Sequence, residues 1–212
     1  MRVCLASTSP ARLMLLRQAG IEPDTMAPDV DEEAVIEAVE AAEGRLPADA
    51  HVLLLARAKA ADVAARLAPT DFDGIVVGGD SMFEIDGEIL GKPYTADAAT
   101  ARWRSMRGRT GVLHSGHSVW RVAPGIPPMK AFAVAEASVT FAADVSDAEI
   151  AAYVATGEPL LVAGAFTVDS LGGAFIERVE GDPSTVVGMS LSTVRRLAGE
   201  LGVPWPTLWN RG

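Results

Sequence analysis

The chain has 212 residues, of which 49% are hydrophobic, and its mean hydropathy of +0.22 is typical of a globular protein rather than a disordered one. The formal net charge is −10 and the pI is about 4.7, with no block of lysines or arginines, which argues against extended nucleic-acid or anionic-membrane partners. A small anionic ligand would need cations gathered locally, and so the place of each lysine and arginine is informative.

The chain shows no membrane or disulfide pattern. No apolar run approaches the roughly 18 to 20 residues that span a bilayer, and no secretory apolar region follows Met1 and Arg2, so we expect a cytoplasmic protein. The single cysteine, Cys4, lies in a predicted strand and is expected to be a buried, inert thiol. Because no linker or repeat interrupts the chain, we expect residues 1–212 to form one domain.

The first twenty residues predict a strand that runs directly into a helix. Residues 3–6 form a short apolar strand, Ser9 caps a helix over residues 10–19, and Pro10 takes its first position. The N–H groups of the helix, the Ser7 hydroxyl and the Arg12 guanidinium would together form an anion site. The alternative is an ordinary helix cap with a surface arginine.

Carboxylates and lysines recur at three later places. Residues 28–33 are acidic and include Glu32, which could also be part of a solvated turn or of the first turn of a helix. Residues 47–67 have helical periodicity and carry Lys59, which would otherwise face solvent. A buried strand over residues 74–81 ends at Asp80, the end at which α/β proteins often place functional groups, although an isolated aspartate there can simply cap a turn. Lys92 follows across a hairpin turn.

The second half of the chain predicts two long strands, two helices and a glycine-rich stretch. The strands cover residues 113–122 and 131–142, and a capping box at residues 146–149 opens a helix that ends near residue 155. Glycines are dense over residues 163–173, ahead of a strand over 175–179 and a helix over 192–201. His114 and His117 lie three apart on a strand and so point to opposite faces, which excludes a paired-histidine metal site.

The motifs, taken together and in order, resemble those of the Maf family of nucleoside triphosphate pyrophosphatases, also called septum-formation inhibitors. The resemblance covers roughly residues 3–202. Its motifs are residues 5–12 (LASTSPAR), 30–32 (VDE), 58–60 (AKA), 79–81 (GDS), 91–93 (GKP), 153–159 (YVATGEP), 163–166 (AGAF) and 187–191 (VGMSL).

The resemblance implies an α/β fold like that of the inosine triphosphatase group, with an elongated mixed sheet, flanking helices and two lobes around a nucleotide cleft. It implies metal-dependent hydrolysis of a nucleoside triphosphate to the monophosphate and pyrophosphate, as house-cleaning of non-standard or surplus nucleotides, in a homodimer linked to septum formation. The metal would be Mg²⁺ or Mn²⁺.

The resemblance also implies roles for particular residues. Asp80 would be the general base, a metal-held carboxylate or both, and Glu32 a second metal ligand. Phosphates would be bound by four residues: Ser7, Arg12, Lys59 and Lys92.

Base choice would depend on three positions: Ala11, Ser81 and Asp169. An ionised aspartate only accepts hydrogen bonds, so Asp169 would favour a donor-bearing guanine or cytosine base over uracil and thymine, unless it points to solvent or to a backbone N–H. Ala11 stands where the family has the first of two arginines, which removes one expected cation.

Two other functions fit the sequence less well. A nucleotide-binding regulator of cell division without turnover would not need to keep Asp80, Glu32, Lys59 and Lys92 together. A metal-dependent nuclease is disfavoured by the acidic balance of the chain.

Overall fold

The computed structural model describes residues 1–210, in which helices and strands alternate as expected of a mixed α/β protein. The strands are β1 Arg2–Ala6, β2 Asp24–Thr25, β3 Gly74–Ile85, β4 Glu88–Ile89, β5 Thr110–Ala123, β6 Ile126–Phe141 and β7 Ile176–Gly181. The α-helices are α1 Pro10–Gln18, α2 Glu32–Glu43, α3 Ala48–Leu67, α4 Ala96–Met106, α5 Asp147–Ala155, α6 Pro183–Val187 and α7 Leu191–Glu200. Short 3₁₀ helices are η1 Glu158–Leu161, η2 Ala163–Ala165, η3 Leu171–Phe175 and η4 Trp205–Leu208.

The strands form a mixed sheet, as predicted. Hydrogen bonds order them β2-β1-β3-β5-β6-β7, with β4 beside β3. β1 runs parallel to β2 and β3, whereas β4 pairs with β3, and β7 with β6, in the antiparallel sense. None of the helices within residues 1–210 is long and apolar enough to cross a membrane.

The described residues divide into two compact units. Unit 1 comprises Met1–Ser81, Ser115–Ala135 and the described residues from Gly188 onward, and unit 2 comprises Met82–His114 and Glu136–Val187.

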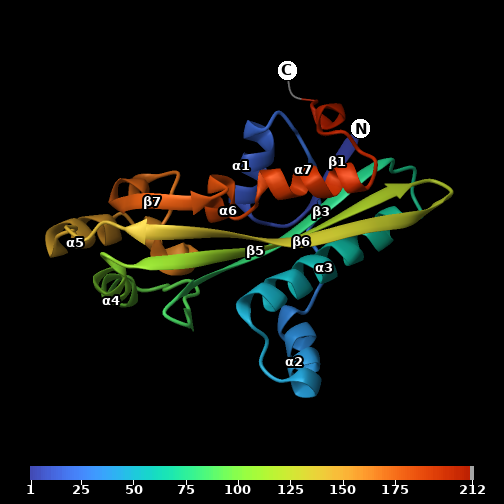
Figure 1. Cartoon of the computed structure of the whole chain (residues 1–212). Coiled ribbons are helices and arrows are strands. Elements are labelled where there is room, and N and C mark those ends of the chain that lie inside the picture. Colours follow the sequence, from blue (N-terminus) through green and yellow to red (C-terminus); the bar gives the residue numbers. More distant parts are fainter. Residues whose placement is uncertain (211–212) are drawn as a thin grey trace. The chain divides into compact units, whose positions relative to one another are not determined.

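In unit 1 the strands separate α3 from α1 and α7, an arrangement visible in Figure 1. Two adjacent glycines of β3 show why. A Cβ on Gly78 would lie 2.7 Å from the Cβ of Ala60 on α3, whereas a Cβ on Gly79 would lie 3.3 Å from Nε of Arg12 on α1. Successive strand residues face opposite sides of a sheet, so each helix packs closely against its own glycine. Along the rest of β3, successive residues continue to face the two sides in turn.

Unit 2 is built around the buried indole of Trp103 on α4. The ring meets Phe141, Tyr153 and Phe175 edge-on or nearly so, with centroids 5.3 to 5.6 Å away, and its Nε1 donates to the carbonyl of Ala165 at 2.7 Å. Edge-to-face aromatic packing of this kind adds to area burial. The core of unit 2 therefore fixes the backbone at Ala165, the last residue of η2.

Several boundaries differ from the predicted ones. β3 continues past Asp80 to Ile85, because residues 82–85 still alternate and Glu84 and Ile85 pair with β4. The acidic residues 32–43 form a full helix, α2, capped by Asp31, and the predicted capping box at Ser146 and Glu149 is present. Near its C-terminus the described chain packs back, since Leu208 is buried.

Candidate active site

The predicted site residues of unit 1 gather where β1 ends. Ala6, the last residue of β1, lies opposite Gly78, and β3 continues past the end of β1 to Asp80 and Ser81. The carboxyl ends of parallel strands are where α/β folds place their functional groups. Because Asp80 has the parity of Gly78 and Ser81 that of Gly79, the two residues point to opposite faces, toward α3 and α1 respectively.

On the α1 face, the strand-to-helix turn forms as predicted. Ser9 caps α1 by accepting from the backbone N–H of Arg12 at 3.4 Å, and Pro10 takes the first helical position. The Ser7 hydroxyl accepts from the backbone N–H of Ser9 at 3.1 Å. The N-terminus of α1 carries a partial positive charge at this point, so the turn suits a phosphate oxygen.

Arg12 does not lie on the surface but in a set of neutral acceptors. Its Nε donates to the carbonyl of Gly188 at 2.8 Å, and its two terminal nitrogens donate to the hydroxyls of Ser7 and Ser81, each at 3.2 Å. Ser81 is held in turn by the fully buried Ser115, with 2.8 Å between their hydroxyl oxygens. These contacts occupy three of the five guanidinium N–H groups, which leaves one on each terminal nitrogen.

The guanidinium carries its charge without a carboxylate beside it. Arg12 and Lys59 are the only buried charged side chains among residues 1–210, exposed by 9% and 7%, and no carboxylate of the described chain lies within ion-pair distance of Arg12. Burial lowers the pKa of Arg12, while the more distant charges of Asp80 and Glu32 raise it. A buried, unpaired charge is costly unless a counter-ion arrives. The surroundings of Arg12 are therefore suited to an anion.

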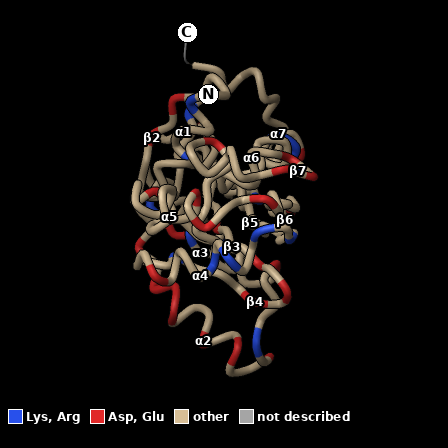
Figure 2. The backbone as a smooth tube through the Cα atoms, turned by 90° about the vertical axis from the view of Figure 1, so that its left-hand side faces the viewer, with Lys and Arg blue, Asp and Glu red and all other residues tan. Residues whose placement is uncertain are grey.

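On the α3 face, Lys59 lies between two carboxylates. Its Nζ is 2.8 Å from Oδ1 of Asp80 and 3.0 Å from Oε1 of Glu32, the latter on helix α2, whose glutamates are red in Figure 2. The Asp80 side chain is 16% exposed and that of Glu32 50%. Lys59 has a third N–H to offer, and Oδ2 of Asp80 has no hydrogen-bond partner in the described part of the chain.

The two carboxylates could share one hard cation. Both reach the same Nζ, so one positive charge already fits between them, and Mg²⁺ is usually bound by one or two carboxylates together with substrate phosphates and water. Within residues 1–210 no three acidic, histidine or cysteine side chains cluster as a ready-made metal cage. The donor set thus fits a metal that arrives with a phosphate ligand, rather than a permanent protein-only site.

Sequence reasoning missed Ser115 and Gly188. Gly188 has a φ of +125°, which L side chains rarely adopt, and its carbonyl accepts from both Arg12 and Ser81. Ser81, which the resemblance linked to base choice, lies against the guanidinium of Arg12. The motif at residues 187–191 was the available signal for Gly188, whereas nothing local in β5 distinguishes Ser115 from the neighbouring buried residues.

The remaining predicted residues lie elsewhere. Lys92 and Asp169 belong to unit 2, where both side chains are exposed, and Asp169 makes no hydrogen bond with residues 1–210. Ala11 is half-buried in the first turn of α1. Their roles remain predictions.

A cavity of about 300 Å³ in unit 1 contains none of the predicted site residues. It lies between α3 and the strands β5 and β6, and its two cations already face aromatic rings, Lys130 over Trp120 and Arg57 over Phe132. The unpaired charge of Arg12 instead favours a ligand site at the end of β1, beside β3.

Comparison with known proteins agrees with the motif pattern. A family model described as "Maf-like protein" matches residues 2–201. A curated protein of Leifsonia xyli subsp. xyli named "Nucleoside triphosphate pyrophosphatase" is 58% identical over 211 residues, covering 100% of this chain and 98% of its own. One of the same name from Salinispora tropica is 54% identical, covering 100% and 89%.

Among solved structures, the Staphylococcus aureus Ham1 protein aligns with 99% of this chain and 94% of its own, at 9% identity and a TM-score of 0.35. That score is too low to support an argument about fold.

Proposed function

Because this chain belongs to the Maf family, we propose that it hydrolyses a nucleoside triphosphate to the nucleoside monophosphate and pyrophosphate. The observation that carries the proposal is the buried guanidinium of Arg12, which keeps one N–H on each terminal nitrogen and has no carboxylate partner. Two such N–H groups match two oxygens of one phosphate. The adjacent helix N-terminus adds backbone N–H groups that favour the same ligand.

The reaction requires a water molecule to attack the α-phosphorus while the bond from that phosphorus to the bridging oxygen breaks and pyrophosphate leaves. Oδ1 of Asp80 is held by Lys59, so Oδ2 is the oxygen that accepts the proton of the water. Lys59 offers its third N–H to a phosphate oxygen, and Arg12 and Ser7 hold others, which disperses the charge that develops on the phosphates.

Glu32 and Asp80 would hold a divalent cation, Mg²⁺ or Mn²⁺, which when bound would neutralise phosphate charge. The resemblance supports the finer parts of the proposal. Lys92 binds a phosphate, and Asp169 reads the base and favours one with donors. The enzyme acts as a cytoplasmic homodimer that removes non-standard or surplus nucleotides, with a link to septum formation.

The test measures pyrophosphate release from a panel of nucleoside triphosphates with and without Mg²⁺. Asp80→Asn should keep the fold and lower kcat by about 10²- to 10⁴-fold. Asp24→Asn is the control, because Asp24 is exposed and pairs only with Arg2 in unit 1, and it should leave kcat unchanged. If no nucleotide yields pyrophosphate but several bind, the chain is a nucleotide-binding regulator instead and the proposal is wrong.

A further inference from the structure

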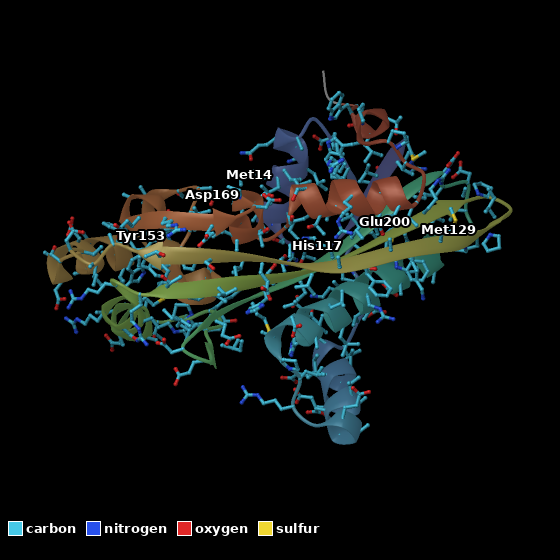
Figure 3. The ribbon with its side chains drawn as sticks, in the orientation of Figure 1. Met14, His117, Met129, Tyr153, Asp169 and Glu200 are labelled. Carbon is cyan, nitrogen blue, oxygen red and sulfur yellow. The ribbon has the colours of Figure 1, made fainter. Side chains whose placement is uncertain are left out.

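In unit 2, one carboxylate accepts hydrogen bonds from residues on both sides of Asp169. Residues 166–170 are neither helix nor strand, and they lead from η2 into η3. Five hydrogen bonds run to Glu158 on η1: from the hydroxyls of Tyr153, Thr167 and Ser170, and from the backbone N–H groups of Leu171 and Gly172. Figure 3 labels Tyr153 and Asp169, which lie in the same region of unit 2.

The two oxygens of Glu158 accept hydrogen bonds from different donors. Oε1 accepts from Tyr153 at 2.9 Å and from Gly172 at 3.0 Å, as well as from Thr167. Oε2 accepts from Ser170 at 2.8 Å and from the N–H of Leu171 at 3.3 Å. Oε2 therefore holds the two residues that directly follow Asp169.

The loop also packs tightly against this region. A Cβ on Gly172 would lie 2.6 Å from the hydroxyl oxygen of Tyr153 and 2.7 Å from the carbonyl oxygen of Thr167. Although burial opposes it, the hydrogen bonds, that from Thr167 first, lower the pKa of Glu158 to about 2. The side chain is thus ionised at neutral pH and accepts hydrogen bonds without donating any, which matches the five donors around it.

We propose that Glu158 is a positioning residue for base choice, which holds residues 167–172 in the conformation that presents Asp169. The inference rests on the proposed function, in which Asp169 reads the base. Glu158 touches no substrate in this scheme. Its loss should therefore change the ratio of affinities for two bases and leave the grip on phosphates intact.

Glu158→Gln is the principal variant, because it keeps the size of the side chain but replaces one acceptor oxygen with an NH₂ group, which cannot accept. Ser170→Ala is a milder variant that removes one donor at an exposed position. Glu149→Gln is the matched control, because Glu149 also accepts hydrogen bonds, from Ser146 in the capping box of α5, and has none from the loop.

Three quantities are measured in each variant: hydrogen exchange of the Leu171 and Gly172 amides, the ratio of kcat/KM for GTP and dTTP, and the Kd of inorganic pyrophosphate. The ratio of Kd for GTP and dTTP is also measured in the Asp80→Asn background, where turnover is suppressed. We expect Glu158→Gln to speed amide exchange and to reduce base discrimination by about 5-fold or more, with pyrophosphate affinity unchanged. Ser170→Ala should act in the same direction but less, and Glu149→Gln should change nothing.

A double-variant comparison separates positioning from a general loss of stability. Asp169→Asn should alter the GTP to dTTP ratio in the wild-type background and have little further effect in Glu158→Gln. An unchanged ratio or unchanged amide exchange in Glu158→Gln overturns the inference, as does an equal loss of pyrophosphate affinity. If the wild type discriminates in Kd and Glu158→Gln loses that discrimination, but no nucleotide yields pyrophosphate, the proposed function is refuted and the role of Glu158 is supported.

Discussion

Replacement of Arg12 by methionine should separate stability from function. Removing a buried arginine that stabilises the fold should lower the free energy of unfolding substantially, whereas removing one that mainly binds a ligand should not. The structure allows the cost to be worked out, because each acceptor of Arg12 has a second donor. The Gly188 carbonyl keeps Ser81 at 3.1 Å, the Ser7 hydroxyl keeps the N–H of Ser9 at 3.1 Å, and Ser81 keeps Ser115 at 2.8 Å.

No buried acceptor is therefore left unsatisfied in Arg12→Met, and the penalty for burying the guanidinium disappears. The loss of the charged hydrogen bonds is offset by relief of the desolvation cost of the buried guanidinium, which is several kcal/mol. The free energy of unfolding should thus change by about 1 kcal/mol or less. Methionine fills a similar volume with a flexible apolar chain.

The effect on activity should be much larger. Loss of a two-pronged contact to phosphate should lower kcat/KM by at least about 10-fold, because a single charged hydrogen bond is worth about 1.5 kcal/mol or more. Urea unfolding and pyrophosphate release are measured on the same protein, with Arg17→Met as control, because Arg17 lies on the same helix but pairs with Glu22 at the surface. A loss of more than about 3 kcal/mol with unchanged kcat/KM would refute the reasoning.

Other outcomes are expected from single groups. Lys59→Met should lower the free energy of unfolding by about 1 to 3 kcal/mol in urea titrations, since it leaves two neighbouring carboxylates without their cation. Gly188→Ala should cost about 1 to 3 kcal/mol at its positive φ and should lower kcat/KM by displacing the carbonyl that holds Arg12. The folded pKa of Glu158 is lowered from 4.5 to about 2, so its stabilisation is complete above about pH 4.5 and is lost as the pH falls toward 2; the unfolding midpoint of wild type should fall over that range by more than that of Glu158→Gln. Burial raises the pKa of Cys4 to about 11, so iodoacetamide at pH 8 should label the thiol only in urea.

The local rules predicted most elements of unit 1. The turn from β1 to α1 was readable because serine, proline and apolar spacing each act within a few residues of themselves. The resemblance assigned Glu32, Lys59 and Asp80 to one site, but the ion pairs of Lys59 with the two carboxylates were not predicted, because the three residues come from different elements. Propensity contains no information on such distances.

The orientation of Ser81 shows what local pattern could not supply. The sequence identified residues 74–81 as a buried strand, and alternation then requires Asp80 and Ser81 to face opposite ways, but which helix covers which face depends on the packing of α1 and α3. The continuation of β3 to Ile85 was missed because an aspartate and a serine resemble the end of a strand. Here the tertiary contacts of the two polar residues override their propensity.

Because Gly78 and Gly79 face opposite sides of the sheet, the site forms only when β3 pairs with its neighbours in the correct register. Sliding β3 by one residue against its neighbours would exchange the faces of Asp80 and Ser81, placing a hydroxyl beside Lys59 and a carboxylate beside Arg12. A slip in one direction would also place Val77 in the contact of Gly78, where a Cβ would lie 2.7 Å from α3, and a slip in the other direction would place Asp80 in the contact of Gly79. Folding errors in this strand would therefore yield inactive molecules rather than partially active ones, and anyone grafting the site onto another scaffold must transplant the strand and both helices as one piece.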